Sequence, residues 1–322
     1  MTVTDAYFDG LGGITMIGVA QTMFPAMGTV NGISICGMDK IGVLDKAKEY
    51  VLGLDNALSV FSRDSEITHF NAQSGNWVSL SEDTFHLLSD SVRMGELTGG
   101  AFDITSGPLN RIWKRAFEIK ELPTAKMIGK AKKLVGWQEI ELDPASRRAR
   151  LKRRGMSVDF GGIAKGYAAD RLFEMMRCEG VENAMVNLGG TVGILGQASQ
   201  VGIQNPYRPT GKSLGFLTLE NCFAITSGTY ERGTDINGKR YHHIIDPRSG
   251  EPAQSGLISV TLIGKNATEL DALATATLVM GIEKTRPLLQ ERGIEAVVIT
   301  DNGGIYLTGG IETDFQLIKQ GA

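Results

Sequence analysis

Apolar residues recur with helical spacing in several segments of the chain. From Asp39 to about Leu58 they fall close to every 3.6 residues, at positions such as Ile41 and Leu44, which predicts an amphipathic helix. Side chains that typically cap helix N-termini precede other segments of this kind. We therefore expect further helices after Ser65, Ser81, Thr124 and Asn266, from Ala164 to about Cys178, and beyond Gly281.

Short apolar runs bounded by glycine, proline or asparagine predict strands between these helices. Asn237-Gly238 and the segment 301–304 predict the tight turns of two β-hairpins. Strands are expected through Ile33 and Ile35 and at 139–142, 148–152, 184–186, 216–219, 223–225 and 258–263, with 216–219 and 223–225 forming a pair. Helices between runs of strands indicate an α+β fold with largely antiparallel sheets and flanking helices.

Two stretches lack a regular period. Residues 1–20 are rich in glycine, and residues 101–108 are predicted to form a polar loop bounded by glycine and proline. Nothing resembling a linker divides the remainder. We therefore expect an N-terminal extension at 1–23 and one domain at 24–322, which two subdomains could build.

Composition and charge narrow the class of protein. Apolar residues make up 42% of the chain, enough for a sizeable core, and the net charge of −3 gives no general attraction to nucleic acid or anionic lipid. The sequence has neither a run of ~18 apolar residues nor a basic leader followed by an apolar run. The chain as given is expected to be cytoplasmic; the alternative is an exported, membrane-anchored protein whose signal has been removed.

The segment from Val158 to Asp170 predicts a short strand, a glycine turn and a helix. Gly161 and Gly162 permit a sharp turn or a close approach to a ligand, and Lys165 falls in the first helical turn. Free N–H groups at a helix N-terminus beside a lysine favour an anion such as phosphate. The alternative is an ordinary turn with one surface lysine. The glycine spacing fits neither a P-loop nor a dinucleotide fingerprint.

Asp271 and Thr275 lie four residues apart on a helix of otherwise apolar composition, so they share a face. Polar groups in such surroundings need a partner. A hard cation is one candidate, because two protein oxygens, a backbone carbonyl and nucleotide phosphates suit Mg²⁺. In the alternative, Thr275 bonds to its own helix and Asp271 faces water.

His242 and His243 are adjacent, so in an extended strand their side chains point to opposite faces. At most one of them therefore faces a given site. His243, with Asp246 in the following turn, fits a general base. The alternative is a structural histidine bonded to a backbone carbonyl.

Seven segments, in order along residues 24–310, together resemble the ApbE family, the FAD:protein FMN transferases. They are Ala26 to Thr29, Gly100 to Thr105, Asp159 to Gly166, Asn187 to Gly190, Thr226 to Gly228, His243 to Gly250 and Asp271 to Thr275. The resemblance implies an ApbE-like, T-fold-like architecture. It also implies an enzyme that binds FAD with Mg²⁺ and transfers FMN to a threonine or serine hydroxyl of a target flavoprotein, with release of AMP.

The resemblance also assigns roles to particular residues. His243 would accept the proton of the incoming hydroxyl, and Asp271, Thr275 and the carbonyl of Gly162 would hold Mg²⁺. The residues expected to contact FAD are Met27, Phe61, Ala101, Phe102, Asp103, Asp159, Lys165 and Ile245.

Thr191 and Thr229 depart from the family pattern, which commonly has aspartate at both positions. We expect either change to alter the metal surroundings or the target groove without abolishing FAD binding. Two other functions use the same residues: an Mg²⁺-dependent FAD diphosphatase that releases FMN and AMP, and a non-catalytic FAD-binding protein. The intact His243, Asp271 and Thr275 favour catalysis over storage.

Overall fold

The structure, a computed structural model, describes residues 2–3 and 18–318. Its helices are α1 (Ile41–Leu58), α2 (Glu66–Ala72), α3 (Glu82–Leu97), α4 (Gly107–Ile119), α5 (Ala125–Lys132), α6 (Ala164–Cys178), α7 (Ala267–Met280) and α8 (Ile282–Glu291). Its strands are β1 (Thr2–Val3), β2 (Val19–Ala26), β3 (Thr29–Cys36), β4 (Val78–Ser79), β5 (Ile140–Asp143), β6 (Arg148–Leu151), β7 (Ala184–Asn187), β8 (Thr191–Leu195), β9 (Ser199–Gln204), β10 (Ser213–Leu219), β11 (Cys222–Gly228), β12 (Gly233–Ile236), β13 (Lys239–His242), β14 (Ile245–Asp246), β15 (Glu251–Pro252), β16 (Leu257–Gly264), β17 (Glu295–Thr300), β18 (Ile305–Leu307) and β19 (Phe315–Leu317).

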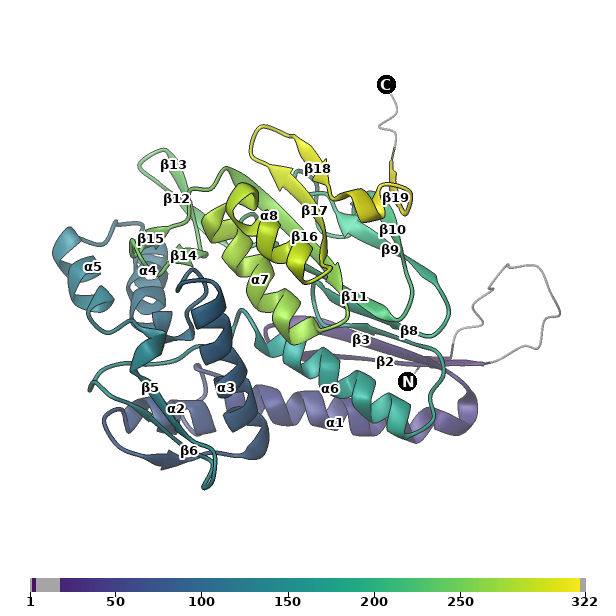
Figure 1. Ribbon diagram of the computed structural model, residues 1–322, viewed down its shortest axis with the longest axis horizontal. Coiled ribbons are helices and arrows are strands. Elements are labelled where there is room, and N and C mark those ends of the chain that lie inside the picture. The colour runs from purple at the N-terminus through teal and green to yellow at the C-terminus, as the bar shows by residue number, and fades with distance from the viewer. Residues whose placement is uncertain (1, 4–17, 319–322) are drawn as a thin grey trace.

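A nine-stranded sheet forms the centre of the molecule, in the order β1-β2-β3-β7-β8-β11-β16-β17-β18. Every neighbouring pair in it is antiparallel. Helices α1, α6 and α7 pack against this sheet, as Figure 1 shows. These features confirm the predicted α+β class with antiparallel sheets and flanking helices.

A smaller sheet, β19-β10-β9, packs against the central sheet through a separate apolar cluster. Val201 and Leu217 of the small sheet meet Ile194 and Ala224 of the central sheet in this cluster. The buried residues of α6 and α7 belong to the main core instead, so the central sheet is covered on both faces.

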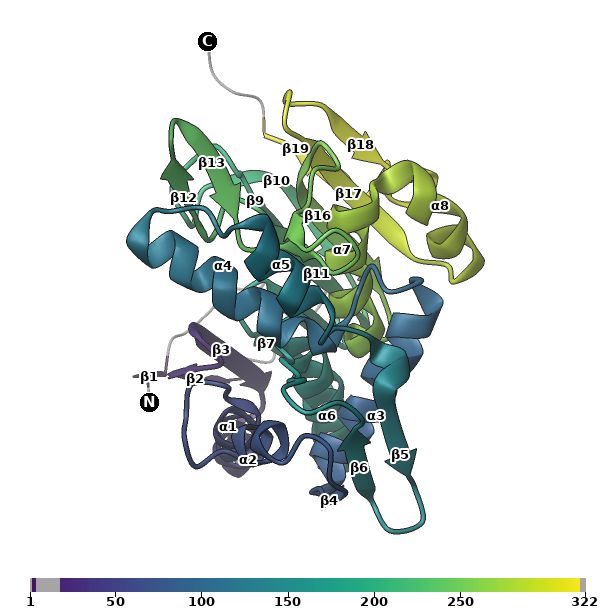
Figure 2. The same ribbon diagram turned by 90° about the vertical axis from the view of Figure 1, so that its left-hand side faces the viewer.

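Helices α4 and α5 form a third region beside the hairpin β12–β13, in front of the central sheet in Figure 2. The indole N–H of Trp113 in α4 donates to the carbonyl of Gly250 at 2.8 Å, and its ring stacks on Tyr241 with centroids 5.8 Å apart. Ile245 packs in the same apolar cluster. Helix α4 therefore supports the chain segment that carries His243.

Three predictions about secondary structure and strand pairing are wrong. The predicted loop at 101–108 runs into α4, because Gly107-Pro108 begins a helix, where proline needs no N–H donor. Strands β10 and β11 do not pair with each other, since the chain crosses from the small sheet to the central one between them. Val158 to Phe160 forms no strand; the N–H and C=O of Val158 bond the side-chain amide of Asn71 instead.

No helix within the described part of the chain combines the length and the apolar character needed to cross a membrane. Most of the predicted N-terminal extension lies outside the described residues.

Helices α6 and α7 approach each other at Gly166, where a Cβ would overlap the carbonyl oxygen of Ala267. We expect Gly166→Ala to lower the free energy of unfolding by about 1–3 kcal/mol or more, because the two helices must move apart. The matched control is Gly53→Ala in α1, where a Cβ meets nothing within 4 Å. That change should raise stability by roughly 0.5–1 kcal/mol. Urea unfolding of the two variants would measure these changes in stability. Equal changes in the two variants would contradict the close contact between α6 and α7.

Candidate active site

One large cavity, of about 1170 Å³, opens where the turns of the central sheet meet the N-terminus of α6. Its walls include the β2–β3 turn, the β7–β8 turn, the end of β11, and the loops before α4 and α6. All twelve residues predicted for the site line this cavity: Met27, Phe61, Ala101, Phe102, Asp103, Asp159, Gly162, Lys165, His243, Ile245, Asp271 and Thr275. The structure thus brings together residues from six distant segments, while their individual roles stay predictions.

His243 is held by a single backbone carbonyl. Its Nδ1 lies 3.1 Å from the carbonyl oxygen of Arg232, which also accepts the backbone N–H of His243 at 3.2 Å. Since a carbonyl only accepts, Nδ1 carries the hydrogen and Nε2 keeps its lone pair. Nε2 has no hydrogen-bond partner among the described residues. The side chain is therefore fixed in the tautomer that a base needs.

The prediction that Asp246 assists His243 is wrong. Both carboxylate oxygens of Asp246 accept hydrogen bonds at 2.9 Å from the guanidinium of Arg248. Arg248 holds the pKa of Asp246 below its usual range against the opposing effect of burial. The carboxylate is engaged two residues along its own turn, and the Arg232 carbonyl orients the imidazole instead.

His242 bonds backbone groups through both ring nitrogens, whereas His243 does so through Nδ1 alone. Nε2 of His242 lies 2.9 Å from the carbonyl oxygen of Ala253, and its Nδ1 accepts the N–H of Ile244 at 3.3 Å. Both ring nitrogens are occupied, so His242 cannot take up a proton without losing a bond. The two adjacent histidines thus form a natural pair of test and control.

Burial lowers the pKa of His243 to about 4, and the positive charges of Arg232 and Lys165 act in the same direction. Because the folded pKa lies below the ordinary value of about 6.5, the unfolded chain binds more protons between these values. The contribution of His243 to stability is complete above about pH 6.5 and falls as the pH decreases towards 4. This linkage should lower the free energy of unfolding by about 2 kcal/mol between pH 7 and pH 5.

We expect His243→Gln to remove the loss of stability at low pH that His243 causes. The loss caused by other groups should remain, including that of His242, whose pKa is also lowered by burial. The measurement is urea unfolding of both proteins at pH 7 and pH 5. Parallel losses in the wild type and the variant would contradict the buried, neutral state of His243.

Asp271 and Thr275 of α7 line the cavity one helical turn apart. Asp271 is 3% exposed, and one carboxylate oxygen accepts the N–H of Gly166 at 3.0 Å. Its other oxygen has no hydrogen-bond partner among the described residues. Thr275 Oγ1 lies 3.4 Å from Ser227 Oγ, and a Cβ on Gly162 would lie 3.3 Å from Thr275 Oγ1.

This donor set fits a hard divalent cation. It offers a carboxylate and a hydroxyl on the wall of a cavity that Gly162 also lines and that can admit further ligands. Thr275 does not bond back to its own helix, and Asp271 is buried, so the alternative weighed from the sequence is wrong.

The segment before α6 is arranged around Asp159. This carboxylate accepts the N–H of Gly161 at 3.0 Å and the side-chain amide of Asn110 at 3.2 Å. Lys165 follows in the first turn of α6 and makes no ion pair with any described residue. Its ammonium is therefore available to an anion in the cavity.

The loop before α4 is shaped by Asp103. Its carboxylate accepts hydrogen bonds from the N–H and hydroxyl of Thr105 at 2.8 and 2.6 Å and from the N–H of Trp137 at 3.0 Å. Burial nevertheless raises its pKa. Asp103 thus fixes the loop that presents Ala101 and Phe102 to the cavity.

Phe61 lies at the mouth of the cavity with 74% of its surface exposed. The ammonium of Lys114 lies 4.3 Å from the centre of its ring. An exposed aromatic ring at a cavity mouth is a suitable surface for stacking a planar ligand.

Sequence reasoning missed the contribution of Glu231 and Arg232. Both line the cavity, and burial raises the pKa of Glu231 against the opposing charges of Lys165 and Arg232. The carbonyl that orients His243 belongs to Arg232. A backbone contact of this kind leaves no signal in residue type.

The two departures from the family pattern lie beside the cavity: Gly190 and Val192 flank Thr191, Gly228 and Tyr230 flank Thr229, and these four neighbours line it. Thr191 is fully buried within β8, and the N–H of Thr229 donates to the carbonyl of Ile258 at 2.9 Å. Neither is among the described residues that line the cavity. The expectation that they alter the metal surroundings or the target groove stays a prediction.

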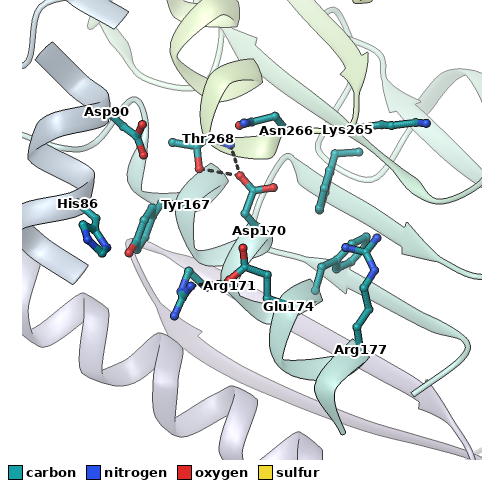
Figure 3. Close-up of a pocket in the computed structure, with 12 residues that line it drawn as sticks. His86, Asp90, Tyr167, Asp170, Arg171, Glu174, Arg177, Lys265, Asn266 and Thr268 are labelled. Atoms are coloured by element: carbon teal, nitrogen blue, oxygen red, sulfur yellow. Dashed lines mark hydrogen bonds and ion pairs between the residues drawn. The ribbon is translucent and has the colours of Figure 1, made fainter. Parts of the chain in front are cut away.

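A second cavity, of about 350 Å³, lies beside α6 and the start of α7 (Figure 3). There, Asp170 of α6 accepts the N–H groups of Ala267 and Thr268 at 2.9 and 2.7 Å and also binds the Thr268 hydroxyl. Burial raises the pKa of Asp170. Because Asp170 caps α7, the helix that carries Asp271, we interpret its role here as structural.

Solved structures share this fold over nearly the whole chain. The ApbE protein of Thermotoga maritima covers 92% of this chain and 99% of its own, with a TM-score of 0.84 and 29% identity. The flavin transferase ApbE of Vibrio cholerae covers the same shares, with a TM-score of 0.79 and 25% identity. The fold thus groups this chain with the ApbE flavin transferases among solved structures.

Sequence comparison narrows this class to one family. The model of the ApbE family matches residues 27–298, so the chain belongs to the ApbE family. A FAD:protein FMN transferase of Klebsiella pneumoniae (strain 342) is 34% identical over 83% of this chain and 85% of its own. That of Treponema pallidum (strain Nichols) is 32% identical over 79% and 76%. The resemblance predicted from the sequence motifs is confirmed.

Proposed function

We propose that this protein is a FAD:protein FMN transferase that requires Mg²⁺. It would move FMN from FAD to a serine or threonine hydroxyl of a target flavoprotein, forming a phosphodiester and releasing AMP. The observation that carries this proposal is the tautomer of His243, whose Nε2 retains a free lone pair in a side chain that lines the same cavity as Asp271 and Thr275.

The reaction needs a base, a positioned donor and neutralisation of charge. The acceptor hydroxyl oxygen forms a bond to the phosphorus of the FMN half of FAD, and the bond from that phosphorus to the bridging pyrophosphate oxygen breaks. The bridging oxygen leaves with AMP, and the hydroxyl proton passes to Nε2 of His243. The low pKa of His243 keeps Nε2 unprotonated at neutral pH, ready to accept that proton.

Charge neutralisation comes from groups on either side of the α6 N-terminus. Asp271, Thr275 and the carbonyl of Gly162 would hold Mg²⁺, which supplies positive charge to the pyrophosphate. Lys165 would bind a phosphate oxygen from the first turn of α6, where the positive end of the helix dipole also favours an anion.

The remaining predicted residues would hold FAD. Phe61 would stack on a ring of the ligand at the cavity mouth. Met27, Ile245 and the loop from Ala101 to Asp103 would line its path through the cavity, and Asp159 would keep the turn before α6 in place.

The test is to incubate the protein with FAD and Mg²⁺, with and without an acceptor domain from a flavoprotein that carries covalent FMN on threonine. We expect the acceptor to gain the mass of one FMN, AMP to appear, and both to be lost with a chelator. Free FMN and AMP regardless of acceptor would identify a diphosphatase. FAD recovered intact with a competent acceptor would contradict the transferase.

A further inference from the structure

Strand β9 forms one edge of the small sheet β19-β10-β9. It pairs with β10 alone, and its opposite edge has no strand partner in the described part of the chain. An edge of this kind presents backbone N–H and C=O groups that another extended chain can bind.

The register shows which residues face this edge. The N–H of Thr218 in β10 bonds the carbonyl of Asp314, on the side away from β9. Alternate residues of an antiparallel strand bond to the same side, so Phe216 also faces away from β9. Their partners in β9, Gln200 and Gly202, therefore direct their backbone groups to the open edge.

The open edge lacks the features that usually block strand pairing. Strand β9, with the sequence SQVGIQ, contains neither a charged residue nor proline. The other terminal strands of the described sheets are two or three residues long, or are four residues long and carry charges. An uncharged edge strand of six residues favours pairing with a strand of another chain, so its retention suggests that the protein binds a partner there.

The edge leads directly into the cavity of His243. Residues 201–204 of β9 line that cavity, and Val30 of the β2–β3 hairpin lines it as well. A hydroxyl that reaches Nε2 inside a cavity must be carried by a chain extended enough to enter it. A strand paired with Gln200 and Gly202 would be guided towards the cavity.

We propose that the target protein binds by adding an extended segment to the open edge of β9, so that its backbone bonds Gln200 and Gly202 and its acceptor hydroxyl enters the cavity. This proposal rests on the transferase function. Recognition of this kind derives its affinity from main-chain hydrogen bonds, and side-chain pockets add selectivity.

The test compares Gln200→Pro with Gln200→Ala. Proline removes one N–H that faces the open edge and breaks no bond to β10, whereas alanine keeps that N–H. Gln200 does not line the cavity, so FAD binding and kcat should match the wild type in both variants. We expect Gln200→Pro to raise KM for the acceptor domain about tenfold and Gln200→Ala to change it less than about twofold.

Each other outcome has a defined meaning. Equal KM values for the wild type and Gln200→Pro would overturn edge binding while leaving the transferase standing. A wild type that neither modifies nor binds a competent acceptor would overturn the transferase and edge binding together. A wild-type dimer that dissociates in Gln200→Pro, with KM unchanged, would show that a second copy occupies the edge.

A second measurement tests edge binding in the wild-type protein, in case Gln200→Pro does not fold. Acceptor peptides N-methylated at single positions should lose affinity for the wild-type protein at alternate residues, because only every second N–H faces β9. Loss without this period of two would contradict strand addition.

Discussion

Replacing His243 with alanine should lower the rate of FMN transfer by about 10²- to 10⁴-fold, the usual contribution of a general base. The imidazole is the group whose Nε2 stays free while Nδ1 is tied to the Arg232 carbonyl. FAD affinity should change little, because the cavity keeps its other predicted contacts. Single-turnover transfer to an acceptor and equilibrium titration with FAD would measure the two effects separately.

The control is His242→Gln, one residue earlier. Both nitrogens of His242 serve backbone groups, so this change should lower thermal stability and leave transfer within a few-fold of the wild type. If both variants lost transfer equally, the base would have to be sought elsewhere. If His243→Ala turned over normally, the assignment would be wrong.

Replacing Asp271 with asparagine should weaken Mg²⁺ binding by roughly 100-fold, since even changes to groups behind the ligands commonly cost 10- to 100-fold. The amide can still accept the Gly166 N–H, so the fold should survive while the negative charge is lost. Mn²⁺ binding in the presence of FAD, followed by electron paramagnetic resonance, gives a readout that is independent of turnover.

Thr275→Val and Thr277→Val form a matched pair on the same helix. The hydroxyl of Thr277 bonds the carbonyl of Leu273 at 2.8 Å within α7, whereas that of Thr275 lines the cavity. We expect only Thr275→Val to weaken cation binding. Unaltered Mn²⁺ affinity in both Asp271→Asn and Thr275→Val would exclude the proposed metal site.

Local sequence signals predicted much of the fold. The cap at Asn266 and the run of apolar residues after it gave α7, and the N-cap oxygen does accept the N–H of Glu269 at 2.9 Å. The same spacing placed Asp271 and Thr275 on one face. These predictions succeeded because the period and the caps are properties of a few neighbouring residues.

Contacts between segments that are distant in sequence, such as strand pairing and hydrogen bonds, were not predictable from local signals. The pattern of 216–219 and 223–225 identified two strands without showing that they belong to different sheets. Asp246 was selected as a partner of His243 because it is close in sequence, but the carbonyl of Arg232 fills that role. The order of the family motifs predicted which residues belong to the site, and the fold places those residues around one cavity.

The contact between α6 and α7 has a consequence for how the site is prepared. Gly166 of α6 donates to Asp271 of α7, and Asp170 of α6 caps the first turn of α7. Each helix therefore immobilises part of the other. The Asp271 carboxylate loses its conformational entropy when the protein folds, so this entropy is not lost again when a cation binds. The site is preorganised, so loosening the helix crossing should reduce cation affinity before the protein unfolds.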